Sequence, residues 1–211
     1  MNDLAHAAGK RLARLATRVV VAQPRLWPLF RRPLRANFDA LAPEWHGLVG
    51  SEALAPLAAA LDRLGRSPAR VLDLGTGTGK AGRLVAERFP EADVVGVDLS
   101  PAMVAEARRL LPPDLGTRVR FEVGDASALP FPDGAFDLVV LLNMIPFFAE
   151  IGRLAAPAAA VVVAHTSGPS TPIWTPADTL RSQLAALGFG GFEELAAGAG
   201  TAFLATRRED E

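Results

Sequence analysis

The chain has 211 residues, of which 50% are hydrophobic, and a formal net charge of −1 at pH 7. This length and apolar content suffice for one domain with a buried core, and the balanced charge creates no overall field that would attract nucleic acid. The chain contains neither cysteine nor tyrosine. Their absence excludes disulfides, thiolate zinc sites, cysteine nucleophiles and the tyrosine proton donor of the usual short-chain dehydrogenase.

The first 35 residues are strongly basic, with eight Lys or Arg residues and a single acid, Asp3. Apolar side chains recur on one side of a helix in this segment, at Leu4, Ala8, Leu12, Leu15, Ala16 and Val19. This periodicity predicts an amphipathic helix that ends before Pro24. We interpret it as a lid that packs on the core with its arginines in solvent, and contact with an anionic membrane surface stays open as the alternative.

Nothing in the chain resembles a membrane span or a secretory signal. The longest apolar run, residues 154–164, is interrupted by Pro157, and basic residues interrupt the apolar positions near the N-terminus. We therefore expect a cytoplasmic protein and interpret residues 154–164 as a helix end followed by a buried strand.

From residue 70 onward, strand patterns alternate with helix patterns, which predicts an α/β fold with a mainly parallel sheet between helical layers. Ser100 followed by Pro101 is a helix start signal. The expected strands span residues 70–74, 93–98, 119–123, 136–142, 158–164, 192–195 and 202–206, and further helices are expected at about 79–88 and 179–187. We expect three regions: an N-terminal helical lid over 1–50, a ligand-binding core over 51–206, and a disordered tail over 207–211.

The most informative motif is the glycine-rich turn after the first of these strands. Residues 71–79 read Val-Leu-Asp-Leu-Gly-Thr-Gly-Thr-Gly, and Asp98 ends the second strand about 20 residues further on. Glycines let backbone amides approach a ligand closely, and a carboxylate at this spacing can bond both hydroxyls of a ribose. The pattern predicts a site for a nucleotide-sized ligand.

The turn alone does not identify that ligand. Residues 77–82 also match the G-x-G-x-x-G of dinucleotide enzymes. A phosphate loop is excluded, because Leu74 and Ala81 stand where it needs glycine and Ser or Thr. Asp73 would repel a pyrophosphate, and Asp125 adds a third carboxylate at a strand end, where an adenine amino group needs an acceptor.

Four successive motifs resemble those of the class I S-adenosylmethionine-dependent methyltransferases. They are Asp-Leu-Gly-Thr-Gly-Thr-Gly, Val-Asp-Leu-Ser-Pro-Ala-Met, Gly-Asp-Ala and Leu-Pro-Phe-Pro-Asp-Gly-Ala-Phe-Asp-Leu-Val, within residues 68–165. The chain is most similar to the small-molecule branch that includes the ubiquinone and menaquinone C-methyltransferases. The resemblance implies a Rossmann-like fold whose seven-stranded sheet ends in an antiparallel strand, and S-adenosyl-L-methionine as the cofactor.

The resemblance also implies roles for individual residues. Gly75 and Gly77 would line the methionine part of the cofactor, Asp98 would hold the ribose, and Asp125 with Ala126 would frame the adenine. The remaining candidates are Asp73 near the ligand ammonium, Leu99 and Met103 around the base, and Asn143 at the end of the fourth strand. No metal ligand set is expected.

Two histidines are candidate general bases. His165 ends the fifth expected strand on the rim where an acceptor would bind, and His46 lies in a segment that resembles the entrance of the quinone-type enzymes. A base is needed only if the acceptor holds its proton near neutral pH. For both residues, bonding of nearby backbone is the alternative.

The sequence also departs from the family. Residues 143–146 are not the Asn-Pro-Pro-aromatic quartet of amide and exocyclic-nitrogen methylases, and Ala-Pro-Ala-Ala replaces the common Pro-Gly-Gly turn at 156–159. With little room for an insertion at 142–160, the acceptor site must come from residues 20–50 and 165–178. Their aromatic side chains favour a small hydrophobic or aromatic acceptor. A catalytically inactive regulatory protein of the same fold and an NAD-dependent oxidoreductase stay open as alternatives.

Overall fold

The computed structural model describes residues 3–48 and 50–207, which form one seven-stranded sheet with helices around it. The strands are β1 (Arg70–Leu74), β2 (Asp93–Asp98), β3 (Val119–Val123), β4 (Phe136–Leu142), β5 (Ala155–His165), β6 (Phe189–Ala197) and β7 (Gly200–Arg207). Their order in the sheet is β3-β2-β1-β4-β5-β7-β6. The strands β1 to β5 pair in parallel, and β7 is antiparallel to both β5 and β6. This topology confirms the predicted fold class.

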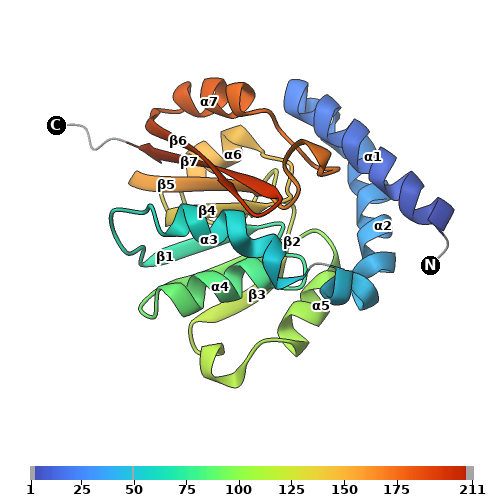
Figure 1. Ribbon diagram of the computed structural model, residues 1–211, viewed down its shortest axis with the longest axis horizontal. Coiled ribbons are helices and arrows are strands. Elements are labelled where there is room, and N and C mark those ends of the chain that lie inside the picture. Colours follow the sequence, from blue (N-terminus) through green and yellow to red (C-terminus); the bar gives the residue numbers. More distant parts are fainter. Residues whose placement is uncertain (1–2, 49, 208–211) are drawn as a thin grey trace.

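The helices fall into the covering layers and a separate N-terminal pair (Figure 1). They are α1 (Asp3–Ala22), α2 (Trp27–Leu48), α3 (Ala55–Leu61), α4 (Lys80–Arg88), α5 (Pro101–Arg109), α6 (Phe148–Leu154) and α7 (Ala177–Ala185). Figure 1 shows α1 and α2 together at one end of the sheet, beside the segment that follows β5. We call α1 and α2 the lid. Within the described residues no helix combines the length and the apolar character that crossing a bilayer requires.

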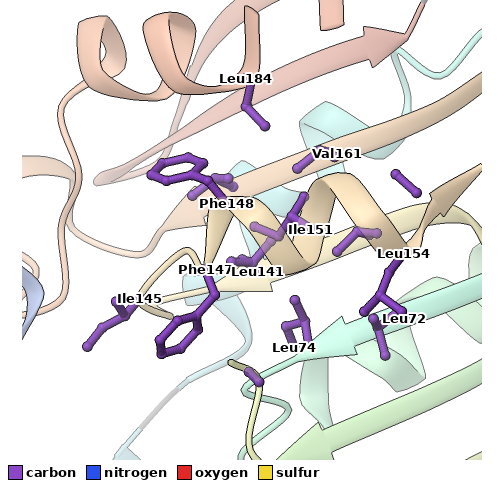
Figure 2. Close-up of a cluster of buried hydrophobic side chains, with 14 of the residues drawn as sticks. Leu72, Leu74, Leu141, Ile145, Phe147, Phe148, Ile151, Leu154, Val161 and Leu184 are labelled. Carbon is purple, nitrogen blue, oxygen red and sulfur yellow. The ribbon is translucent and has the colours of Figure 1, made fainter. Parts of the chain in front are cut away.

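The core has two parts because alternate residues of a strand point to opposite faces of the sheet. Leu72 and Leu141 belong to one buried cluster, whereas Val71 and Val140 belong to another. Figure 2 shows part of the first cluster, in which Ile151 of α6 lies among side chains from the strands. The first cluster also takes in lid residues, Ala13, Ala16, Val20, Trp27 and Leu34. The lid is therefore packed into the main core.

Most predicted boundaries agree with the structure to within three residues. The first helix ends at Ala22, as Pro24 predicts, and Ser100 caps α5 by accepting a hydrogen bond from the Met103 amide. The lid, however, continues as α2 through Pro33 and Pro43.

The structure differs from the prediction at the start of β5. We expected a turn at 156–159, but α6 ends at Leu154 and the strand begins at Ala155. The pairing with β4 shifts between Phe136, opposite Ala155, and Leu138, opposite Ala160. A bulge of this kind accommodates Pro157, which has no amide to donate to the ladder. The chain therefore needs no glycine turn there.

The C-terminal hairpin is longer than predicted. Arg207, which we expected to begin the tail, ends β7 instead. Its guanidinium donates to the carbonyls of Gly152, Ala155 and Leu187 and lies over the ring of Phe189. Residues 208–211 lie outside the described part of the chain.

Candidate cofactor and acceptor site

A cavity of about 570 Å³ lies at the carboxyl ends of the parallel strands. Gly75 after β1 and Asn143 after β4 both line it, so it lies between the neighbouring strands at which the strand order reverses. Open α/β sheets bind their ligands at this position. The lid closes the cavity on one side, and residues 166–173 after β5 line another.

The glycine-rich turn forms the floor of the cavity. Gly75, Gly77 and Gly79 have φ angles of +71°, +54° and +80°, which disfavour any residue with a Cβ. A Cβ at Gly75 would also lie 2.6 Å from the sulfur of Met144. The glycines thus allow a turn that no side chain fills, as the motif predicts.

Asp98 lies at the end of β2 and lines the cavity. One carboxylate oxygen accepts from the Gly77 amide and the other from the Ser100 amide, each at 2.9 Å. Each oxygen keeps a second lone pair, so the carboxylate can still accept from two ligand hydroxyls. Burial raises the pKa of Asp98, and hydrogen bonds from the backbone amides of Ser100, Gly77 and Leu99 work against that shift.

Asp73 does not line the cavity; its carboxylate instead forms hydrogen bonds with the glycine-rich turn and the start of α4. One of its oxygens accepts from the Thr76 hydroxyl at 2.5 Å and from the Gly82 amide at 2.9 Å, while the other is buried without a partner among the described residues. Burial raises its pKa to about 6. In this structure Asp73 therefore joins the turn to the first residues of α4.

Asp125 is engaged by the lid. Its carboxylate accepts from the Trp27 indole at 2.9 and 3.1 Å and from Arg31 at 3.2 Å, and it also bonds Ser127. Burial raises the pKa of Asp125, but these hydrogen bonds together outweigh it and lower the pKa. Asp125 is not part of the cavity wall, although its neighbours Gly124 and Ala126 are.

Other predicted contacts do line the cavity, namely Leu99, Met103, Ala126 and Asn143. Asn143 is the one described non-glycine residue with a positive φ, +54°. Its side chain is fixed by two hydrogen bonds with Thr166, from its amide to the hydroxyl at 3.1 Å and from the Thr166 N–H to its oxygen at 3.0 Å. Asparagine tolerates the left-handed conformation better than most residues, and here it ties the ends of β4 and β5 together.

The structure does not bring His165 to this cavity. His165 is 2% exposed, its Nε2 accepts from the Thr175 amide at 3.3 Å, and it lines a separate, smaller cavity beside Trp174. Burial lowers its pKa to about 4. His46 lies in α2, but its side chain is outside the described residues. A base role for either histidine stays a prediction.

Sequence reasoning missed the inner face of the lid. His6, Lys10 and Arg14 line the cavity from α1, and Asn37 and Trp45 line it from α2. His6, Lys10 and Arg14 are spaced four residues apart, so they share one face of a helix. This spacing was the sequence signal that could have grouped them. Among the described residues, no group of three or more carboxylate or imidazole side chains is placed to hold a metal ion.

The chain matches known methyltransferases. Residues 71–165 match the family model described as a methyltransferase domain. The chain is 46% identical over 107 residues to a demethylmenaquinone methyltransferase of Thermus thermophilus. This match covers 47% of this chain and 48% of the relative. It is 38% identical over 151 residues to a malonyl-[acyl-carrier protein] O-methyltransferase of Halorhodospira halophila. This match covers 67% of this chain and 50% of the relative. The chain thus spans about half the length of these relatives.

A solved structure shares the fold. The S-adenosylmethionine-dependent methyltransferase of Aquifex aeolicus superposes with a TM-score of 0.64 at 18% identity, over 78% of this chain and 97% of that one. The motifs, the domain match and the sheet topology agree. Residues 71–165 therefore form a methyltransferase domain, and the chain belongs to the class I S-adenosylmethionine-dependent methyltransferases.

Proposed function

We propose that this protein binds S-adenosylmethionine in the cavity and methylates a small molecule that enters beneath the lid. The observation that carries the proposal is the convergence of the glycine turn, Asp98 and the lid on one cavity at the reversal of strand order. The relatives named above are methyltransferases by name, which supports the same activity here.

The residues present fit the cofactor. Asp98 keeps lone pairs for ribose hydroxyls, the turn leaves space beside its amides, and Leu99, Met103 and Ala126 provide apolar walls for a base. Because Asp125 accepts hydrogen bonds from Trp27 and Arg31, we assign it to the contact between the lid and the core. We propose that its neighbours contact the adenine instead. When bound, the cofactor supplies an activated methyl group on a sulfonium.

The protein's own contribution is mainly positioning. The lid and residues 166–173 enclose the space next to the turn, which excludes water and fixes the approach of the acceptor. Apolar side chains from both walls favour a hydrophobic or aromatic body for that acceptor. They are Leu34, Leu41, Ile145 and Ile173. No observation among the described residues specifically favours an oxidoreductase or a non-catalytic role.

Calorimetry tests the cofactor assignment directly. We expect S-adenosylhomocysteine to bind the purified protein and NADH to give no heat of binding under the same conditions. Binding of NADH without binding of S-adenosylhomocysteine would overturn the assignment. Transfer of a labelled methyl group to members of a small-molecule library would then separate an enzyme from an inactive protein of the same fold.

A further inference from the structure

The inner face of α1 carries a stripe of three basic side chains into the cavity. His6, Lys10 and Arg14 are spaced four residues apart and all line the cavity. Gly9 and Ala13 lie between them on the same face and also line it, and a Cβ at Gly9 would lie 2.3 Å from the Asn37 side chain. α1 packs closely on α2 at this face, so the stripe lies along the rim of the cavity, with His6 partly buried and Lys10 and Arg14 exposed.

These side chains have unused hydrogen-bonding capacity. The Nε2 of His6 is shielded from solvent and has no partner among the described residues. Arg14 donates to the Ser170 carbonyl at 3.2 Å, which uses one of its five N–H groups. Lys10 forms no salt bridge with any residue in the described part of the chain. The stripe thus offers several donors and two positive charges to whatever occupies this part of the cavity.

No described carboxylate near the stripe balances this charge. Within the described cavity wall Asp98 is the single acidic residue, and it lies at the cofactor end against the Gly77 amide. Asp39 of α2 is outside the wall, where it accepts from the Ser100 hydroxyl and pairs with Arg35. Across from the stripe the wall is neutral and polar, with the hydroxyl groups of Thr166, Ser167, Ser170 and Thr171.

Resting on the proposed function, we propose that the acceptor is an oxyanion: a small molecule with an apolar body and a carboxylate or phosphate group that Lys10 and Arg14 bind. A neutral acceptor would leave the shielded His6 nitrogen without a partner and would make no charge-assisted contact with the exposed Lys10 and Arg14 side chains. An anionic one completes them through charge-assisted hydrogen bonds. The lid then selects the acceptor by charge, while the turn after β1 holds the cofactor.

A matched pair of fluorescent probes tests this assignment without knowledge of the acceptor. 8-Anilinonaphthalene-1-sulfonate carries a sulfonate, and N-phenyl-1-naphthylamine is the same skeleton without it. Both are titrated into the full chain with saturating S-adenosylhomocysteine. We expect the double variant Lys10→Gln, Arg14→Gln to bind the sulfonate at least about tenfold more weakly and the neutral probe unchanged, because the variant loses two charge-assisted contacts and tenfold corresponds to only about 1.4 kcal/mol for the pair.

The double variant Arg11→Gln, Arg18→Gln is the matched control. It removes the same net charge from residues of α1 that are exposed, as Lys10 and Arg14 are, but that lie outside the cavity wall. We expect it to leave both dissociation constants unchanged. An unchanged sulfonate affinity in the first variant, or an equal loss in both, would overturn the proposal in favour of a solvated basic face.

Failure of this proposal is distinguishable from failure of the proposed function. Binding of S-adenosylhomocysteine is measured by calorimetry in every variant, and we expect it to be equal in all of them. If the wild type does not bind it, the methyltransferase proposal fails. In that case the probe titrations are repeated without S-adenosylhomocysteine, and they still decide whether the stripe binds an anion.

Discussion

At the scale of single residues, we expect cofactor binding to depend most on the side chain of Asp98. Its two oxygens are already oriented by the Gly77 and Ser100 amides, so its remaining lone pairs are fixed in direction. We expect Asp98→Asn to weaken S-adenosylhomocysteine binding by about 2–3 kcal/mol, because hydrogen bonds to a charged acceptor are the stronger kind. Calorimetry measures this, with the exposed Glu91→Ala as control. A folded Asp98→Asn protein with wild-type affinity would place the ribose elsewhere.

Asp73 predicts a pH dependence of stability. Because burial raises the pKa of this carboxyl from 3.8 to about 6, the folded state holds the proton more tightly than the unfolded state. The associated stability is full below about pH 4 and is lost as the pH rises through about 6, a change of about 3 kcal/mol. Urea unfolding between pH 4 and 7 should show this loss in the wild type relative to Asp73→Asn. Parallel curves for the two proteins would contradict it.

His165 provides a test of the base that the sequence suggested. A general base contributes about 10²–10⁴ in rate, and that loss would follow His165→Gln if the histidine took the acceptor's proton. Its position in a separate cavity, bonded to the Thr175 amide, leads us to expect turnover within about threefold of wild type at saturating cofactor. A loss of 10² or more would instead restore His165 as the base.

At the scale of elements, one indole makes both a hydrogen bond and a ring contact between the lid and the core. Trp27 at the start of α2 donates to Asp125 beyond β3 and packs edge-on against Phe147 at 5.0 Å between ring centroids. We expect Trp27→Phe to keep the packing, lose the hydrogen bond, and destabilise the lid by about 1 kcal/mol.

Hydrogen exchange locates this effect. Amides of α1 and α2 should exchange faster in Trp27→Phe, while those of β1 and β4 keep their wild-type rates. Trp174→Phe, outside the lid, is the control. Equal acceleration in the lid and the central strands would show that the indole stabilises the whole protein and not the lid contact.

At the scale of the whole molecule, the lid and the sheet share one buried cluster. Because Ala16 and Leu34 of the lid belong to the same cluster as Ile151 of α6, we expect a single cooperative unfolding transition. Ile151→Ala should lower its free energy by about 3 kcal/mol, as for other buried large-to-small changes. Circular dichroism and tryptophan fluorescence, which reports partly on the lid, should give coincident curves. The exposed Leu29→Ala should leave the midpoint unchanged, and two separated transitions would show that the lid unfolds by itself.

The sequence by itself determined the strands of the core, the glycine turn and the position of Asp98. These features depend on neighbours along the chain: apolar runs of strand length, glycines where φ must be positive, and a carboxylate that directly follows a buried strand. They therefore appear in a local pattern.

Tertiary structure alone decided which side chains face the cavity. Asp125 and His165 both lie at or just beyond strand ends, yet Asp125 is bonded by Trp27, which is distant in sequence, and His165 lies outside the cavity wall. Conversely, His6, Lys10 and Arg14 resembled an ordinary solvated helix face in the sequence, and only the packing of α1 against α2 shows that this face lines the cavity. The physical reason is that helical spacing determines which residues share a face, whereas the direction of that face depends on contacts between segments far apart in the chain.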